Sequence, residues 1–153
     1  MNRVKFEIDG EIIGKGRPRF TRTGTVYTPV RTMLYEKQIR KAYIETGAAM
    51  FEGAVYVEIE AIFGVQRSAT KKQREARLKG EEIALRKPDV DNVAKIVLDA
   101  LNGLAWKDDA QVVSIRVIKG RYEEKPRLLC RISDTYPNTI QTVHYLIFGL
   151  EED

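Results

Sequence analysis

An amphipathic helix pattern over residues 91–104, flanked by two pairs of aspartates, constrains the fold of this chain more than any other feature. Asp89 and Asp91 stand at its start, and Asp108-Asp109 follow it. Asp91 occupies the expected N-cap position, and Asn102-Gly103 supplies the expected end. Apolar side chains recur at helical spacing, so one face of the helix must be buried against another layer. That stripe comprises Val93, Ile96, Val97, Ala100, Leu101 and Leu104.

Helices and strands alternate along the rest of the chain. Apolar and polar residues alternate over 53–64, which is typical of a strand with one buried face. We expect a single domain over residues 1–153, of the α/β (α+β) class, with a mixed sheet flanked by helices. Before this strand we expect a first strand or a hairpin through Asp9-Gly10, a basic loop over 14–29, and a helix over 31–49 that buries Leu34, Ile39 and Tyr43. After it we expect a short basic helix over 69–79 that ends near Gly80. Two strands over 111–119 and 127–133, joined by a charged turn at Gly120 to Pro126, complete the expected elements.

Several classes of site are disfavoured by composition. The only cysteine is Cys130, in a strand pattern that predicts a buried thiol, and the only histidine is His144. These two residues cannot build a common zinc site or a credible nucleophile–histidine pair, so any metal chemistry must use carboxylates. Gly14-Lys15-Gly16 does not match a phosphate-binding P-loop, so no nucleotide cofactor is expected. No apolar run is long enough to span a membrane, and residues 1–7 lack the apolar region of a signal peptide, which predicts a cytoplasmic protein.

Positive charge is concentrated in two segments. Residues 15–41 contain eight Lys or Arg and one acid, and residues 67–87 contain eight more against three glutamates. Clustered positive charge is typical of a protein that binds a polyanion, although a solvated surface is the simpler alternative. Phe20 or Tyr27 could stack on exposed bases. The candidate phosphate-binding residues are Lys15, Arg17, Arg19 and Arg22 in the loop, and Lys71, Lys72 and Arg74 in the basic helix.

The aspartates could form a metal site. Side chains at i and i+2 of an extended segment point to the same side, so Asp89 and Asp91 could share a cation. Mg²⁺ prefers oxygen ligands, and Asp108 and Asp109 could complete the set if the strand at 111 lies beside the segment ending at Asp91. Lys95, one helical turn after Asp91, could neutralise the cluster or hold a phosphate. The simpler alternatives are turns, a helix cap and a surface ion pair worth a few tenths of a kcal/mol.

Three motifs together resemble the RusA family of Holliday junction resolvases. They are Asp89-x-Asp91-Asn92-x-x-Lys95, Leu98-Asp99-Ala100-Leu101 and Asp108-Asp109-Ala110-Gln111-Val112. The likeness is strongest over residues 86–119. It is weaker over the first strand, the Gly16–Arg19 loop, Tyr27-Thr28 and the following helix. The segment between Leu101 and Asp108 is a residue or so shorter than in some relatives, and residues 134–153 have no counterpart.

The resemblance implies a RusA-like fold and specific roles for these residues. Asp89, Asp91 and Asp109 would be essential metal-site carboxylates, Asp108 a fourth ligand, and Lys95 the lysine of the catalytic site. It also implies a homodimer that uses Mg²⁺, with Mn²⁺ as a possible substitute, on four-way DNA junctions. The apolar stretch Thr139–Leu150 could complete the core or cover the partner.

The expected function is therefore a Mg²⁺-dependent, structure-selective DNA endonuclease that resolves four-way junctions by paired hydrolytic incision, in recombination and repair. Two other functions stay open at this point. One is a Mg²⁺-dependent nuclease or phosphatase acting on other branched, flap or single-stranded nucleic acid. The other is a non-catalytic junction-binding protein whose aspartates hold a structural ion.

Overall fold

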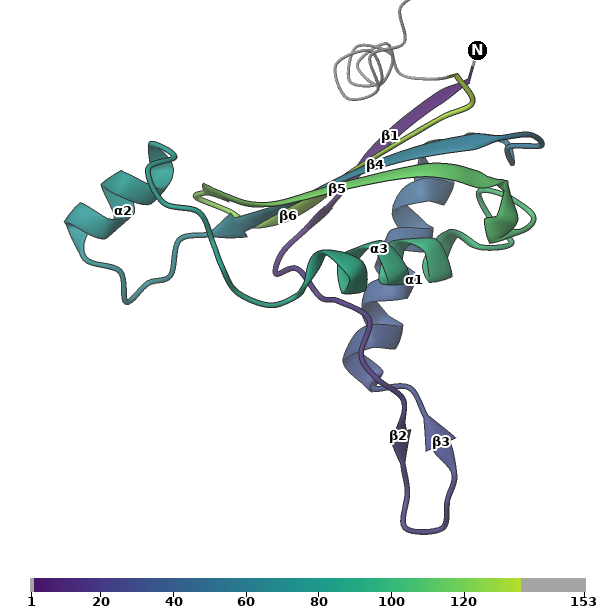
Figure 1. Ribbon diagram of the computed structural model, residues 1–153, viewed down its shortest axis with the longest axis horizontal. Helices are drawn as coiled ribbons and strands as arrows, with labels where there is room; N and C mark the ends of the chain where they lie inside the picture. Colours follow the sequence, from purple (N-terminus) through teal and green to yellow (C-terminus); the bar gives the residue numbers. More distant parts are fainter. Residues whose placement is uncertain (1, 136–153) are drawn as a thin grey trace, which may run out of the picture.

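A mixed four-stranded sheet forms the centre of the molecule in the computed structural model, which describes residues 2–135 (Figure 1). Its strands are β1 (Arg3–Asp9), β4 (Val55–Gly64), β5 (Val112–Glu123) and β6 (Arg127–Ser133), in the order β1-β6-β4-β5. β6 is antiparallel to both of its neighbours, whereas β4 and β5 are parallel. The parallel pair is possible because the chain crosses over through α2 and α3 between these two strands. The expected mixed sheet is confirmed.

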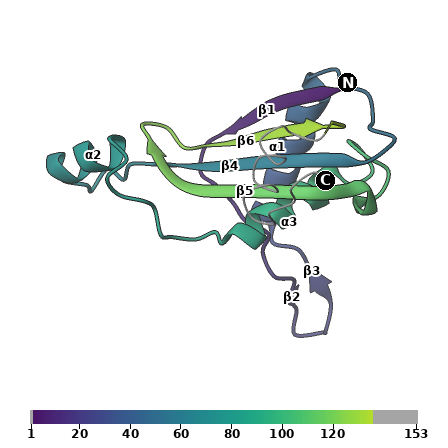
Figure 2. The same cartoon turned by 45° about the horizontal axis from the view of Figure 1, so that its top comes forward.

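Two helices, α1 (Val30–Glu45) and α3 (Val90–Leu101), cover one face of the sheet (Figures 1 and 2). α1 packs on β1 and α3 packs on β5, and the two helices contact each other. The side chains between the helices and the sheet form one apolar core. The burial of this apolar surface stabilises the fold. The core includes Phe6, Ile8, Ile39, Tyr43, Val55, Val57, Ile59, Val93, Ile96, Val97, Trp106, Leu128, Cys130 and Ile132.

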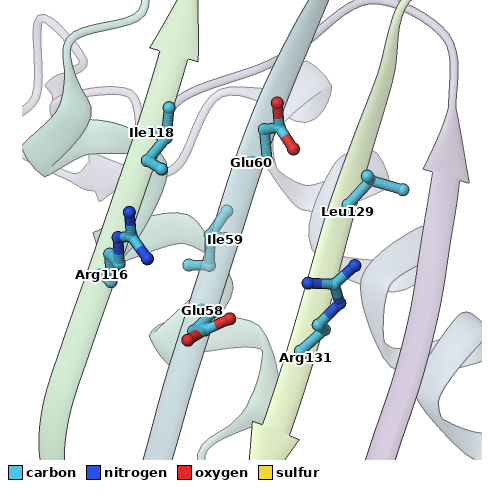
Figure 3. A pocket seen from close by; sticks show the side chains of 7 residues that line it. All are labelled: Glu58, Ile59, Glu60, Arg116, Ile118, Leu129 and Arg131. Atoms are coloured by element: carbon cyan, nitrogen blue, oxygen red, sulfur yellow. The ribbon is translucent and has the colours of Figure 1, made fainter. Parts of the chain in front are cut away.

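The opposite face of the sheet is polar. A pocket on it is lined by two glutamates, two arginines and three apolar side chains, none of which belongs to the aspartate motif (Figure 3). Glu58 is the cross-strand neighbour of both Arg116 and Arg131, so the charges there alternate. This face is therefore a balanced polar surface. The lining comprises Glu58, Ile59, Glu60, Arg116, Ile118, Leu129 and Arg131.

Two basic elements project from this body in different directions (Figure 1). The first is a two-stranded arm made of β2 (Arg19–Phe20) and β3 (Val26–Tyr27), within the loop expected over 14–29. The second is α2 (Lys71–Leu78), which Thr70 and Gln73 begin with a reciprocal capping box. Gly80 follows α2 at φ +81°, as expected for the end of this helix.

The N-cap of α3 lies two residues earlier than the sequence suggested. Its N-cap is Asp89, not Asp91, because the first intrahelical hydrogen bond runs from the Val93 N–H to the Asp89 carbonyl. Asp91 therefore lies inside the first turn. Asn102 caps the C-terminus and Gly103 turns the chain at φ +76°, as predicted. Five residues of the predicted stripe are buried, and Leu104 lies beyond the helix and is half-buried.

Two other expectations need correction, and one open alternative is decided. Leu34 is exposed, because the inward face of α1 is formed by Thr32, Tyr35, Ile39 and Tyr43. Of the two alternatives around Asp9-Gly10, the structure has the single strand β1 and not the hairpin, and β1 pairs with β6. β5 continues through Gly120 to Glu123, so the turn before β6 is shorter than expected.

Cys130 is buried in β6, as predicted. His144 and Thr139–Leu150 lie outside the described residues. Within residues 2–135, no helix is both long and apolar enough to cross a membrane.

Candidate active site

Hydrogen bonds attach the segment that carries Asp89 to the C-terminal half of β5. Lys119 of β5 donates from Nζ to the main-chain carbonyl of Arg86 at 2.6 Å and to that of Pro88 at 3.1 Å. The Ala84 N–H donates to the Gly120 carbonyl at 2.9 Å. A half-buried ammonium bonded to two carbonyls fixes the course of the backbone. Lys119 thus positions the residues just before Asp89, a role that the sequence did not indicate.

Asp89 lies between positive charges. Its Oδ2 accepts a hydrogen bond from Lys87 Nζ at 2.6 Å. That hydrogen bond, with further attraction from the Lys87 and Lys119 charges, holds the pKa of the Asp89 carboxyl below its usual value. The carboxylate makes no hydrogen bond to the helix N-terminus, although Asp89 is the N-cap residue. An ionised, half-exposed carboxylate is therefore presented to solvent at this end of α3.

Asp91 and Lys95 extend this surface along α3. Both side chains are exposed and one helical turn separates them. No ion pair joins them in the part of the chain that the structure describes, so the simple alternative of a surface Asp–Lys bridge is not what this structure shows. Both groups are free to meet a ligand from solvent.

The second aspartate pair follows α3 and belongs to a compact local structure. Trp106 is fully buried, and its indole Nε1–H donates to Asp109 Oδ1 at 2.8 Å. Asp108 Oδ1 accepts from the Ala110 N–H at 2.8 Å and begins the 3-10 turn Asp109–Gln111. A buried indole N–H requires an acceptor, so Asp109 is oriented by the core. Neither Trp106 nor the 3-10 turn had a role in the sequence interpretation.

Gln111 stabilises the same turn from both sides. Its side-chain oxygen accepts from the Lys107 N–H at 2.9 Å and from the Asp108 N–H at 3.2 Å. Its amide nitrogen donates to the carbonyls of Phe51 at 2.9 Å and Gly53 at 3.0 Å. This glutamine sits in the motif Asp108-Asp109-Ala110-Gln111-Val112, which is the signal that could have assigned it a structural role.

The two aspartate pairs stand at opposite ends of α3. A 12-residue helix is about 18 Å long, so one pair cannot reach the other along it. Among residues 2–135, no three Asp, Glu, His or Cys side chains form a group that could hold a metal. The chain therefore offers two separate carboxylate pairs among its described residues, and the expected gathering of four does not occur there. Each pair has the oxygen donors that a hard divalent cation prefers.

The candidate DNA-binding residues fall into two groups. Arg17, Arg19 and Arg22 are exposed on or beside the β2–β3 arm, without an ion-pair partner among the described residues. Phe20 and Tyr27 are also exposed there. Lys71 and Lys72 are exposed on α2, whereas Arg74 pairs with Glu124 at 2.8 Å.

Lys15 differs from the other candidate cations. Its ammonium lies between Glu36 of α1 and Asp99 of α3, and it is 2.9 Å from Asp99 Oδ2. Its backbone N–H donates to the Asn92 carbonyl. A Cβ on Gly14 would lie 2.6 Å from Pro88 Cβ, so the loop rests directly on the aspartate motif. Lys15 thus anchors the base of the arm, and its charge is neutralised there.

Comparison with known proteins agrees with this arrangement. The sequence profile of the family described as "Endodeoxyribonuclease RusA" matches residues 9–133. This chain belongs to the RusA family. It is also 35% identical over 134 residues to the uncharacterized protein YqaN of Bacillus subtilis (strain 168), an alignment that covers 84% of this chain and 94% of YqaN.

Membership of the RusA family supports a Holliday-junction-resolving endodeoxyribonuclease, and therefore a hydrolase that acts on branched DNA. RusA-family nucleases generally depend on a divalent metal. The matched range includes both aspartate pairs, Lys95 and the β2–β3 arm. The resemblance inferred from the motifs is thus confirmed at the level of the family.

Proposed function

We propose that this RusA-family protein is a Mg²⁺-dependent endonuclease that resolves four-way DNA junctions by paired hydrolytic incision, in recombination and repair. The observation that carries the proposal is the surface at the start of α3. There, the ionised carboxylate of Asp89 stands with Asp91 and Lys95, and all three are open to solvent. Asp91 and Lys95 form no ion pair with each other, and an exposed carboxylate pair beside a lysine suits a divalent cation and its bound phosphate better than it suits folding.

Each of the two carboxylate pairs, Asp89 with Asp91 and Asp108 with Asp109, would supply oxygen ligands for a divalent cation, either Mg²⁺ or its possible substitute Mn²⁺. Bound Mg²⁺ would supply a water of lowered pKa and neutralise charge developing on the leaving 3′ oxygen. Lys95 lies on the same exposed side as Asp91 and can place its ammonium against a phosphate oxygen. Asp109 is held by the Trp106 indole, which keeps its carboxylate at a fixed angle.

The basic elements would bind the junction arms. Arg17, Arg19 and Arg22 contact phosphates from the β2–β3 arm, and Lys71 and Lys72 do so from α2. Phe20 and Tyr27 stand beside these arginines, where a base exposed at the branch point could stack on them. Lys15 contributes indirectly, because it holds the arm against α1 and α3.

A homodimer is the proposed working species, because a four-way junction is close to two-fold symmetric and two incisions require two sites. Its DNA substrate suggests the cytoplasm as its location. No nucleotide cofactor is part of the proposal.

Cleavage of a labelled four-way junction, with and without Mg²⁺, tests the function. Paired cuts that need Mg²⁺ support a resolvase, with linear duplex and flap substrates as controls. Cutting of flap or single-stranded DNA in preference to the junction would support the broader nuclease instead. Tight junction binding without any cleavage in Mg²⁺ or Mn²⁺ would overturn the enzymatic proposal.

A further inference from the structure

The segment Gly14-Lys15-Gly16 precedes the β2–β3 arm and lies between the starts of α1 and α3 (Figure 1). It does not match a phosphate-binding loop, and none of its side chains has a direct part in the proposed function. It is nevertheless the place where the proposed DNA-binding arm meets the helix that carries Asp91. We call these three residues the Gly14–Gly16 link.

The first residue of the link touches the backbone on both sides of the Asp89–Asp91 pair. A Cβ on Gly14 would lie 2.6 Å from Pro88 Cβ and 3.0 Å from Asn92 Cβ, which leaves no room for a side chain. Pro88 directly precedes the pair in the chain, and Asn92 directly follows it. The Lys15 N–H also donates to the Asn92 carbonyl at 3.0 Å. Any movement of the link is therefore passed to both ends of this short acidic segment.

The Lys15 side chain ties the link to both helices. Its ammonium bonds to Glu36 of α1 and lies 2.9 Å from Asp99 Oδ2 of α3. The side chains of Lys15, Glu36 and Asp99 are 19%, 22% and 34% exposed, so solvent screens these ion pairs only in part. Hydrogen bonds between charged groups are stronger than those between neutral groups. Lys15 thus joins α1 and α3 at the point where the arm leaves the body.

The last residue of the link sets the direction of the arm. β2 and β3 pair with each other in a sheet of their own, separate from the central sheet. The two legs of the arm meet at the body, because a Cβ on Gly16 would lie 3.3 Å from Cγ of Pro29, the N-cap of α1. The same Cβ would lie 3.0 Å from Oγ1 of the buried Thr32. The arm is therefore held at its base, next to the contacts that reach the Asp89–Asp91 pair.

We propose that the Gly14–Gly16 link makes cleavage selective for branched DNA, by coupling the position of the β2–β3 arm to that of the Asp89–Asp91 pair. The inference rests on the proposed function and names the residues that select its substrate. At a branch point, one DNA arm meets the β2–β3 arm while the next lies over the Asp89–Asp91 pair. The contacts of the link then hold the pair in its productive position. A linear duplex presents no such angle and leaves the pair unaligned.

Contacts far from the scissile bond can act on the reaction in this way. They offset the cost of aligning the reacting groups, so a substrate that lacks them loses maximal rate and not only affinity. A misplacement of about 1 Å can lower a rate by about a hundredfold. Because Gly14 and Lys15 contact the backbone around the Asp89–Asp91 pair, they act as positioning residues. The link should therefore affect the maximal rate on a junction more than the affinity for it.

Two glycines inserted between Gly16 and Arg17 should uncouple the arm from the Asp89–Asp91 pair. The arginines of the arm and the contacts of Gly14 stay in the chain, so folding and junction affinity should change little. The maximal single-turnover rate on a four-way junction should fall by about ten- to a hundredfold, toward the rate on a linear duplex. Gel-shift titration and cleavage of both substrates at saturating protein measure these properties.

The same two glycines inserted after Gly24 are the matched control. Gly24 lies at the tip of the arm with φ +83°, and a Cβ there would meet nothing within 4 Å. This insertion lengthens the arm and leaves its base intact, so the ratio of junction to duplex cleavage should stay as in the wild type. An insertion after Gly16 that keeps this ratio overturns the proposal. Loss of the ratio in both insertions overturns it too, because arm length and not the link would then be responsible.

Lys15→Met and Lys15→Arg provide a second measurement if the insertion after Gly16 does not fold. Lys15→Met removes the ion pairs to Glu36 and Asp99, and should lower the maximal rate on the junction without changing the half-saturating DNA concentration. Lys15→Arg keeps a cation between the two carboxylates and should restore most of the rate. Circular dichroism identifies conditions in which both variants are folded. A folded Lys15→Met variant with wild-type preference for the junction overturns the proposal.

A wild-type protein that cleaves nothing would contradict the proposed function, and the coupling is then measured by binding. Ca²⁺, which takes oxygen ligands, is the probe. If the junction tightens Ca²⁺ binding, Ca²⁺ must tighten junction binding by the same factor. Junction titrations with and without Ca²⁺ at constant ionic strength should show this factor in the wild type and in the Gly24 insertion, and its loss in the Gly16 insertion. Equal factors in all three proteins, or no effect of Ca²⁺ on any, would mean that the link does not couple arm and site.

Discussion

The side chain of Lys119 holds the backbone just before the Asp89 carboxylate, through its hydrogen bond to the Pro88 carbonyl at 3.1 Å. The same ammonium binds the Arg86 carbonyl at 2.6 Å. The relationship joins β5 of the sheet to the loop that begins α3. Asp89 is thus positioned by a residue 30 places away in the sequence, which is how a rigid sheet can set the geometry of a short acidic motif.

Replacing Lys119 with Met should weaken both folding and catalysis. The loss of hydrogen bonds from a charged donor predicts about 1–3 kcal/mol lower free energy of unfolding. The cleavage rate should fall by more than the loss of folded protein explains, because the segment before Asp89 loses the hydrogen bonds that hold it. Junction affinity should change little. Denaturant unfolding and single-turnover cleavage measure the two effects. Lys125→Met, at an exposed lysine, is the control, and equal behaviour of the two variants would contradict the role of Lys119.

Asp89→Asn, Asp91→Asn and Asp109→Asn should each abolish cleavage while junction binding survives. Each change removes negative charge needed for the cation and leaves the phosphate-contacting cations intact, so binding could even tighten. Gel-shift titration and cleavage at saturating Mg²⁺ measure the two properties. Asp9→Asn, at an exposed aspartate on β1, should have no effect on either. Near wild-type cleavage by any of the three would remove that residue from the proposed ligand set.

Lys95→Ala should slow cleavage by roughly two orders of magnitude, the scale of losing one electrostatic stabiliser of a transition state. The free energy of unfolding should hardly change, because the side chain is exposed on α3 and forms no ion pair with any residue between 2 and 135. Rates under single-turnover conditions and thermal melting curves give the two values. A variant that melts early but keeps its specific activity would show that Lys95 is structural.

Neutralising Arg17 and Arg19 together should weaken junction binding. The slope of log K against log salt concentration should become shallower by up to about two units, because two phosphate contacts are lost. Both residues are exposed, so folding should be unaffected. Affinity measured at several salt concentrations checks this prediction, with Lys5 and Lys125 neutralised together as the matched control. An unchanged slope would mean that the arm is a solvated surface.

Lys15→Met should instead lower stability in a pH-dependent way. Burial lowers the pKa of the Lys15 ammonium, but its hydrogen bonds to Glu36 and Asp99 outweigh burial and raise the pKa above the usual value. A raised pKa in the folded state means that charged Lys15 stabilises the fold below about pH 10.5 and that this contribution disappears as pH rises through the folded-state pKa. The difference in free energy of unfolding between wild type and Lys15→Met should be full at pH 7 and should shrink progressively as the pH is raised above 10.5. A difference that does not shrink with pH would contradict the ion-pair explanation.

Much of this fold could be predicted from local sequence patterns. The stripe of α3 and the alternation in β4 depend on side-chain periodicity, and the structure buries both as predicted. The N-cap of α3 was misplaced because Asp89 and Asp91 both suit that position, and only the backbone hydrogen bond from Val93 distinguishes them.

The candidate site was harder to predict from the sequence, because it depends on contacts between segments that are distant along the chain. The pairing of β4 with β5 sets the position of the 3-10 turn that carries Asp109 just before β5, and no local pattern encodes that register. Lys15 was grouped with the exposed arginines by charge alone, whereas Glu36 and Asp99 neutralise it from two helices. The Trp106–Asp109 hydrogen bond likewise depends on the burial of the indole.

The most direct test of the account is incision of a supercoiled plasmid that extrudes a cruciform, with the products separated as nicked circles and linear DNA. With Mg²⁺, the wild-type protein should give mainly linear DNA, because two sites on one junction cut before the complex dissociates. Asp89→Asn should give neither product. Linear DNA that forms without any divalent cation, or no incision in Mg²⁺ or Mn²⁺, would contradict the proposal of a metal-dependent junction resolvase.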